Sequence, residues 1–324
     1  MKAVVYERYG PPEVLELKDV DKPVPRDNEV LIKTQVSTVT SGDCRVRSLK
    51  VPYGFGLLSR LALGIVRPKQ KILGTELAGT VESVGKDVHT FKAGDEVFAF
   101  GDAGMGCYAE YRCMPEDGLL ALKPANLTFE QAAALSFGGT TALHFLRRAN
   151  VQKGEKVLVN GASGTVGTAF VQLARYFGAE VTGVCSAGKM ELVRSLGATH
   201  VIDYAQEDFT RNGQTYDVII DSVGTAPFSH CKASLAARGR LALISASLPE
   251  MLQSPWVSLT GKKKVIAGMA LGRPEDLRLL AELAEEGEFL PVIDRRYPLE
   301  EIVEAHRYAD TGRKKGSLVI SLHS

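Results

Sequence analysis

The sequence has few cysteines and no long apolar segment. Its five cysteines, Cys44, Cys107, Cys113, Cys185 and Cys231, are odd in number and contain no CxxC pair. This usage argues against a disulfide framework and predicts a reduced, cytoplasmic setting. No apolar run approaches the ~18 residues that span a bilayer, and the first residues, MKAVVYERYG, lack the apolar core of a signal peptide. We therefore expect no membrane span.

The chain also lacks an excess of charge of one sign. Its 39 lysines and arginines balance 38 aspartates and glutamates, which leaves a formal net charge of +1. Proteins that bind nucleic acid usually carry a positive excess that neutralises phosphates, so a nucleic-acid partner is not expected. With 324 residues, of which 45% are hydrophobic and 24% charged, the composition predicts a globular protein of roughly two domains.

The pattern of secondary structure changes along the chain. Short β-rich segments with many glycines and prolines extend to about Lys123, and from Leu127 on amphipathic stretches alternate with short β-branched segments. The β-branched segments predicted to be strands are 157–160, 180–185, 200–202, 218–221, 240–245 and 265–268. This βαβ alternation predicts a parallel sheet with helices on both faces, although the strand order does not follow from it. The stretch from Leu290 to Leu322 is again β-rich and is expected to pack on the first part.

A glycine-rich turn follows the first of these strands, in VLVNGASGTVG at residues 157–167. Gly164 and Gly167 allow backbone N–H groups to approach a pyrophosphate at the start of the next helix, while Ala162 stands where the strict GxGxxG pattern has its first glycine. The apolar face of that helix is formed by Val166, Phe170, Leu173 and Phe177. A turn in this position between strand and helix predicts dinucleotide binding, and a purely structural glycine turn is the alternative.

The end of the next strand indicates which dinucleotide binds. An NAD site usually has an acidic residue there, but this strand continues into Ser186, Ala187, Gly188 and Lys189. Lys189 and Ser186 are suited to bind a 2′-phosphate, so NADPH is favoured over NADH. The alternative is a solvated lysine at the start of a helix. Tyr204 follows the third strand and is a further candidate for the same phosphate.

Several motifs together resemble a known superfamily. They are GTELAGTVESVG at 74–85, GDEVFAF at 94–100, GCYAEY at 106–111, GASGTVG at 161–167 and SLGATHVIDY at 195–204. The chain resembles the medium-chain dehydrogenase/reductase superfamily and, within it, the zinc-independent quinone oxidoreductase branch. The resemblance extends from the first strand to the closing GSLVIS.

The resemblance implies an α/β fold of two domains. A GroES-like, mostly-β catalytic domain is expected at 1–124 and 289–324, and a Rossmann domain with a doubly wound parallel sheet that binds NADPH at 125–288. It also implies a site in the cleft between them and a homodimer.

Zinc alcohol dehydrogenases of this superfamily bind a catalytic metal through Cys and His. The matching positions here are Thr40, Thr75 and Phe137, none of which is a reasonable zinc ligand, and the four cysteines of the structural zinc lobe are absent. We therefore predict no metal. Glu76 remains from the zinc motif, as a buried structural carboxylate or as a group with a chemical role.

The resemblance also implies the residues of the site. Thr40 and Asp43 stand where quinone reductases of the family have polar Asn and Asp residues, and Thr40 departs from that Asn. Tyr53 is a candidate proton donor, with an exposed loop tyrosine as the alternative. The residues expected to bind the cofactor are Thr141, Ser163, Gly164, Thr165, Val166, Ser186, Lys189, Tyr204, Val223, Gly224 and Ser245.

Without a metal or a nucleophilic triad, hydride donation from NADPH is the chemistry that remains. Quinones, enones and enals are the expected acceptors because they accept hydride without prior activation by a metal. One alternative is an enoyl-thioester reductase that uses the same hydride transfer. The other is a protein without enzymatic activity, an NADPH-bound sensor or an RNA-binding protein like the relatives that resemble zeta-crystallin.

The segment from Cys44 to Thr75 is basic and apolar and contains no Asp or Glu. Its cations are Arg45, Arg47, Lys50, Arg60, Arg67, Lys69 and Lys71. In one interpretation the segment packs its leucines on its own domain and leaves its charges in water. In the other it is a lid over the cleft that selects bulky hydrophobic substrates.

Overall fold

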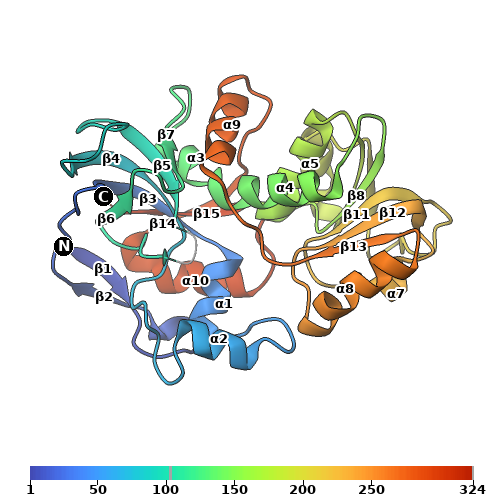
Figure 1. Ribbon diagram of the computed structural model, residues 1–324, viewed down its shortest axis with the longest axis horizontal. Helices are drawn as coiled ribbons and strands as arrows, with labels where there is room; N and C mark the ends of the chain where they lie inside the picture. Colours follow the sequence, from blue (N-terminus) through green and yellow to red (C-terminus); the bar gives the residue numbers. More distant parts are fainter. Residues whose placement is uncertain (102–103, 323–324) are drawn as a thin grey trace. The chain divides into compact units, whose positions relative to one another are not determined.

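A computed structural model describes residues 1–101 and 104–322, which form two units. The antiparallel-sheet unit comprises Met1–Val51, Gly56–Phe137 and Gly272–Ser324. The parallel-sheet unit comprises Pro52–Phe55 and Gly138–Leu271. Both units, with the labels used below, are drawn in Figure 1. This division agrees with the two-domain organisation expected from the length of the chain.

The antiparallel-sheet unit is built around one long strand, β3 (Glu29–Val39), which pairs with β4, β6 and β15. The sheet order is β14-β15-β3-β4-β5-β7, with β6 on β3, and β1 and β2 form a separate pair. The other strands are β1 (Lys2–Val5), β2 (Glu16–Asp19), β4 (Glu76–Val84), β5 (Glu96–Phe100), β6 (Tyr111–Pro115), β7 (Leu120–Leu122), β14 (Ile293–Pro298) and β15 (Ser317–Ser321). The pairing of β15 with β3 confirms that the end of the chain returns to the first part.

Short helices complete this unit. They are α1 (Ser41–Ser48), α2 (Gly56–Leu63), α3 (Phe129–Ala133), α9 (Pro274–Glu285) and α10 (Ile302–Asp310), with single 3₁₀ turns at Pro12–Val14 and Leu299–Glu301. Helix α10 contributes Ile302 and Ala305 to a hydrophobic core that also contains Tyr108 and Leu318. This core places parts of the chain that are far apart in sequence beneath α1.

The parallel-sheet unit has six strands in the order β10-β9-β8-β11-β12-β13, all paired in parallel. The strands are β8 (Lys156–Asn160), β9 (Glu180–Cys185), β10 (His200–Asp203), β11 (Tyr216–Asp221), β12 (Leu235–Leu243) and β13 (Lys264–Ala267). The helical elements are α4 (Ser136–Ala149), α5 (Thr165–Tyr176), a 3₁₀ turn at Ala187–Lys189, α6 (Met190–Ser195), α7 (Phe228–Cys231) and α8 (Leu248–Thr260). The predicted parallel sheet is confirmed.

The strand order has a switch point between β8 and β11. After β8 the chain moves outward through β9 and β10, then returns to β11 and moves outward the other way. Because βαβ crossovers are right-handed, the two halves place their helices on opposite faces, as α5 and α8 show in Figure 1. Ligands of such sheets bind at the carboxyl ends of the strands at this switch point.

The boundaries between the units differ from the predicted 124/125 and 288/289. Helices α3 and α9 belong to the antiparallel-sheet unit. Leu277 and Leu280 of α9 are buried, and Asn126 Nδ2 donates to Ala284 O at 3.0 Å. The amphipathic pattern of α9 indicates that one face is covered but not which unit covers it. Among the described residues, no helix is long and apolar enough to cross a membrane.

Candidate active site

The glycine turn after β8 has the backbone geometry of a phosphate-binding turn. Gly161 has a positive φ of +82°, and a Cβ on Gly167 would lie 2.0 Å from Gly161 O, so both positions require glycine. Helix α5 begins after Gly164, and no side chain caps its first turn. Its N-terminus can therefore present backbone N–H groups to an anion.

A buried carboxylate organises the loop on the other side of the switch point. Asp221, at the end of β11, is 1% exposed. Its Oδ1 accepts from Asn160 Nδ2 at 3.0 Å and from Gly224 N at 3.0 Å, and its Oδ2 accepts from Ala226 N at 2.8 Å. Ser222 Oγ donates to Asn160 O at 2.7 Å. These bonds fix loop 222–226 to the end of β8, next to the glycine turn.

The structure brings the predicted phosphate residues together at the ends of β9 and β10. Tyr204 N donates to Cys185 O at 3.2 Å, so Tyr204 lies beside the turn that starts at Ser186 and contains Lys189. Tyr204 is 65% exposed, and a Cβ on Gly188 would meet nothing within 4 Å. Tyr204 and Gly188 therefore face solvent at this end of the sheet, and binding of the 2′-phosphate here stays a prediction.

Other predicted cofactor residues lie around the same edge of the sheet. Ser163, Gly164, Thr165 and Val166 form the turn and the start of α5. Thr141 lies one turn beyond Gly138, whose Cβ would be 2.8 Å from Thr165 O, so α4 approaches the start of α5. Residues at the ends of β11 and β12 also lie together. A Cβ added to Gly161 would come within 3 Å of Val223, and a Cβ added to Gly224 would lie 3.8 Å from Ser245. These residues fit a dinucleotide.

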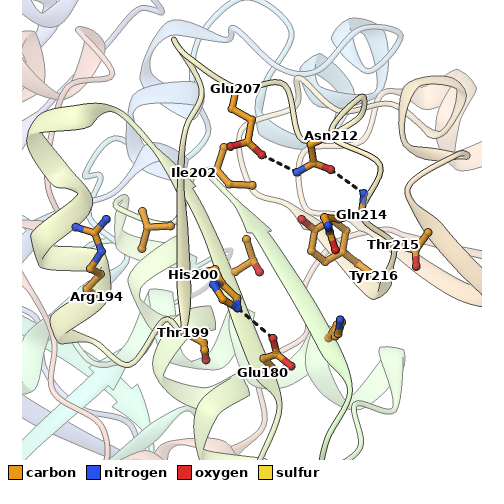
Figure 2. Close-up of a pocket in the computed structure, with 13 residues that line it drawn as sticks. Glu180, Arg194, Thr199, His200, Ile202, Glu207, Asn212, Gln214, Thr215 and Tyr216 are labelled. Atoms are coloured by element: carbon orange, nitrogen blue, oxygen red, sulfur yellow. Dashed lines mark hydrogen bonds and ion pairs between the residues drawn. The ribbon is translucent and has the colours of Figure 1, made fainter.

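A second hollow in the parallel-sheet unit lies at the opposite edge. This pocket of about 410 Å³ is lined by Lys156, Glu180, His200 and Tyr216, the first residues of β8, β9, β10 and β11, together with nine neighbours. Its polar groups bond one another, as Figure 2 shows for His200 with Glu180 and for Asn212 with Glu207. Because the glycine turn is at the carboxyl ends of the strands, this pocket is not part of the cofactor site.

In the antiparallel-sheet unit, Thr40 and Asp43 form a reciprocal cap at the start of α1. Thr40 Oγ1 accepts from Asp43 N at 3.1 Å, and Asp43 Oδ2 accepts from Thr40 N at 2.8 Å and from Thr40 Oγ1 at 2.7 Å. Both side chains are buried, and burial raises the pKa of Asp43 while its bonds to Thr40 oppose that rise. These two predicted residues are therefore brought together.

Further buried polar groups surround this cap. Tyr108 OH donates to Asp43 Oδ2 at 3.2 Å, and burial raises its pKa. The Tyr108 ring packs edge-on against His306 at 5.8 Å, and His306 Nδ1 lies 3.5 Å from Cys44 Sγ. Burial lowers the pKa of His306 to about 3 and raises that of Cys44 to about 12. The Cys44–His306 pair is therefore neutral and is not an activated thiolate.

Glu76 is a second buried carboxylate in this unit. It accepts hydrogen bonds from Thr38 Oγ1 and from Phe137 N. Burial raises its pKa to about 7, and the bonds from Thr38 and Phe137 oppose the rise. The two bonds tie β4 to β3 and to the chain at Phe137, which agrees with the structural interpretation of Glu76.

The three positions that hold zinc in zinc alcohol dehydrogenases are also close in space. Thr40 Oγ1 and Thr75 Oγ1 are 3.3 Å apart, and a Cβ on Gly42 would lie 3.3 Å from Thr40 Oγ1 and 3.7 Å from the Phe137 ring. Two hydroxyls and a phenyl ring do not fit zinc, which prefers thiolate, imidazole and carboxylate ligands. Within residues 1–101 and 104–322, no group of three or more His, Cys, Asp or Glu is placed to bind a metal.

Tyr53 lies in the short stretch Pro52–Phe55, which belongs to the parallel-sheet unit. Tyr53 O accepts from Leu248 N at 2.9 Å, and the side chain is 81% exposed. The exposed-loop alternative therefore describes its surroundings, and its role as a proton donor stays a prediction.

Sequence reasoning missed two sets of site residues. Asn160 and Asp221 were not among the predicted site residues, although polar residues at the ends of two central strands are a usable signal. The approach of His306 to Cys44, 262 positions apart, has no local signal. Only the packing of α10 beneath α1 produces it.

Comparisons with known proteins agree with this geometry. Residues 26–124 match the alcohol dehydrogenase GroES-like domain, and residues 196–320 match a family described as zinc-binding dehydrogenase. The chain is 34% identical to a 2-methylene-furan-3-one reductase of Solanum lycopersicum, over 99% of this chain and 79% of that protein. It is also 34% identical to a quinone oxidoreductase of Sus scrofa, over 94% of this chain and 93% of that protein.

A solved structure shows the same fold. A quinone oxidoreductase of Escherichia coli complexed with NADPH aligns with a TM-score of 0.84 and 26% identity, over 99% of this chain and 100% of that chain. The likeness to these proteins covers both units. The match at residues 26–124 lies mainly in the antiparallel-sheet unit, and the match at 196–320 extends over parts of both units. The chain therefore belongs to the medium-chain dehydrogenase/reductase superfamily, in its quinone-oxidoreductase-like branch.

Proposed function

We propose that this protein is a zinc-independent oxidoreductase that transfers hydride from NADPH to a quinone or an α,β-unsaturated carbonyl compound. The observation that carries the proposal is the carboxyl edge of the parallel sheet. A glycine turn and a carboxylate-organised loop lie there at the switch point, and Lys189 follows the neighbouring strand β9. The bound cofactor supplies the hydride.

Two relatives support the choice of acceptor. One is named a quinone oxidoreductase, and the other reduces a 2-methylene-furan-3-one, in which a methylene group is conjugated with a ketone. Both acceptor types are electron-poor and accept hydride without a Lewis acid. The two threonine hydroxyls and the phenyl ring at the former metal positions agree with such substrates.

In this proposal the residues of the chain bind the cofactor, orient the acceptor and polarise it. Ser186, Lys189 and Tyr204 bind the 2′-phosphate, and Asp221 positions loop 222–226 beside the nicotinamide. Thr40 and Asp43 form the polar part of the acceptor site, and Asp43 Oδ2 accepts from both the Thr40 hydroxyl and Tyr108 OH. Tyr53 is the candidate proton donor that the resemblance to the family implies.

The test is a panel of acceptors with purified protein, followed by loss of NADPH absorbance. We expect turnover with quinones, enals and enones, and little with a crotonyl thioester. Preference for the thioester would identify an enoyl-thioester reductase. NADPH binding without turnover of any acceptor would identify a sensor and contradict the proposed activity.

Zinc independence has its own test. We expect elemental analysis of the purified protein to find no stoichiometric zinc, and chelators to leave the rate of NADPH oxidation unchanged. One zinc ion per chain would contradict the prediction from Thr40, Thr75 and Phe137.

We further propose a cytoplasmic homodimer that does not bind nucleic acid. The balanced charge of the chain supports the last point. A dimer is supported by the position of β13 at an edge of its sheet and by Leu252 and Trp256 of α8, which are 68% and 72% exposed. Analytical ultracentrifugation tests it, and a monomer at micromolar concentration would contradict it.

A further inference from the structure

Helix α2 presents apolar side chains to the outside of the antiparallel-sheet unit. None of its residues is buried. Leu57, Leu58 and Leu61 are 72%, 52% and 53% exposed, and Ile65 and Val66, just beyond the helix, are 62% and 80% exposed. We call these five residues the apolar ridge. The interpretation that the segment packs these leucines on its own domain is wrong for this part of the chain.

Hydrogen bonds and one core contact hold the ridge in place. Lys69 Nζ donates to Leu61 O at 2.9 Å and to Ala62 O at 3.0 Å, and so satisfies carbonyls at the end of α2. Arg60 Nη1 donates to Ile65 O at 2.8 Å. Tyr9 OH donates to Gly64 O at 2.9 Å, and Leu63 packs on the core. The exposure of the ridge is therefore a feature of the folded segment.

The sequence around the ridge contains basic residues and no acidic ones. The stretch 44–75 contains no Asp or Glu. Its exposed cations are Lys50, Arg60, Arg67, Lys69 and Lys71. In the described part of the chain, none of these five side chains forms an ion pair. Their positive charge is therefore not neutralised by the protein.

We propose that this surface docks the protein on an anionic lipid bilayer. Peripheral attachment combines apolar side chains that enter the boundary between headgroups and acyl chains with cations that attract anionic headgroups. The ridge supplies the first, and Arg67, Lys71 and Lys50 on either side of α2 supply the second. Charge complementarity selects an anionic surface rather than a neutral one.

A lipid surface suits this patch better than a groove in a protein partner. A groove requires a matching shape and anionic groups at fixed positions, whereas a bilayer accepts a short ridge and scattered cations without a fixed geometry. The attachment is reversible, since so small a ridge buries little apolar area.

The test measures co-sedimentation of the full-length protein with vesicles. The vesicles are pure phosphatidylcholine or phosphatidylcholine mixed with phosphatidylglycerol. We expect binding to the mixed vesicles at low salt, little binding to pure phosphatidylcholine, and release at high salt, because the Debye length shrinks from about 10 Å at 0.1 M to about 3 Å at 1 M.

Two variants separate the apolar and the cationic parts. Leu57→Ser/Leu61→Ser should lower the partition coefficient at least about tenfold. Arg67→Gln/Lys71→Gln should lower it roughly 25-fold, since each cation near an anionic surface contributes roughly fivefold. The preference for phosphatidylglycerol should weaken but not vanish, because Lys50, Arg60 and Lys69 remain. Lys69 stays unchanged because it holds the end of α2. The matched control is Val24→Ser/Leu122→Ser, which removes two apolar side chains, 83% and 57% exposed, elsewhere on the same unit.

NADPH oxidation with a water-soluble quinone, without lipid, provides the second readout. We expect unchanged KM and kcat in both variants, which also shows that they fold. Equal binding to both vesicle types, or binding of the leucine variant like wild type, would overturn the proposal. A raised KM without lipid would identify the segment as a substrate lid. Loss of a dimer in the leucine variant would identify the ridge as a contact between copies.

Discussion

The two units build their polar sites from different groups. In the parallel-sheet unit the site consists mainly of backbone: a glycine turn, the start of α5, and a loop that one carboxylate, Asp221, holds by its N–H groups. In the antiparallel-sheet unit the polar groups are buried ionisable side chains. Asp43, Glu76 and His306 all have a pKa shifted toward the neutral form by burial.

The two units should therefore respond to different kinds of change. Backbone groups do not titrate, so the cofactor site should respond to changes of shape and of single charges. Buried acids and a buried histidine couple folding to protons, so the antiparallel-sheet unit should determine how stability depends on pH. The following substitutions test this division, from the largest expected effect to the smallest.

Gly167→Ala should have the largest effect on the cofactor site. The added Cβ would lie 2.0 Å from Gly161 O, so the turn must open. We expect NADPH affinity to fall by about a hundredfold and stability by about 1 to 3 kcal/mol. Fluorescence titration and urea unfolding measure these effects. Gly56→Ala, where a Cβ meets nothing within 4 Å, is the control, and equal effects of the two would refute the assignment of the turn.

Glu76→Gln should change how stability depends on pH. The folded pKa of about 7 lies above the ordinary value of 4.5, so the folded state binds more protons between these values. Stability is therefore full below about pH 4.5 and declines as pH rises through 7, by up to about 3 kcal/mol. Glutamine stays neutral and keeps an acceptor for Phe137 N, so unfolding free energies should show a smaller decline. Exposed Glu300→Gln is the control, and an unchanged profile in Glu76→Gln would contradict the buried-carboxyl interpretation.

Lys189→Ala should act on one cofactor only. Loss of a charge-assisted bond to the 2′-phosphate costs about 1.5 to 3 kcal/mol, or roughly ten- to a hundredfold in NADPH affinity. NADH affinity should not change. Lys156→Ala, at the other edge of the sheet, is the matched control. Equal weakening for NADPH and NADH, or a wild-type preference for NADH, would show that Lys189 does not bind the 2′-phosphate.

Asp221→Asn should have the smallest effect of the four. One acceptor oxygen becomes a donor that faces the N–H groups of loop 222–226, which costs about 1 to 2 kcal/mol. We expect the Kd for NADPH to rise roughly five- to tenfold, because the loop loses its position. Asp217→Asn replaces a carboxylate at the other end of the same strand, where Asp217 Oδ2 accepts from Lys156 N. If Asp217→Asn weakens NADPH equally, loop 222–226 is not the cause.

Much of the parallel-sheet unit could be predicted because its signals are contiguous. Strand, glycine turn and helix follow one another in residues 156–176, and Ser186 and Lys189 follow the next strand directly. The polar cluster around Asp43 had no such signal, because Tyr108 and His306 reach it from β-rich and helical segments far along the chain.

The sequence by itself determined the order of the strands along the chain, the phosphate-binding turn and the absence of zinc ligands at Thr40, Thr75 and Phe137. These depend on residue types at short spacing. Only the tertiary structure decided that α9 packs on the antiparallel-sheet unit, that Asn160 bonds Asp221, and that the leucines of α2 face outward. The physical reason is that periodicity shows which face of a helix is apolar, whereas what covers that face depends on segments that meet only in the folded chain.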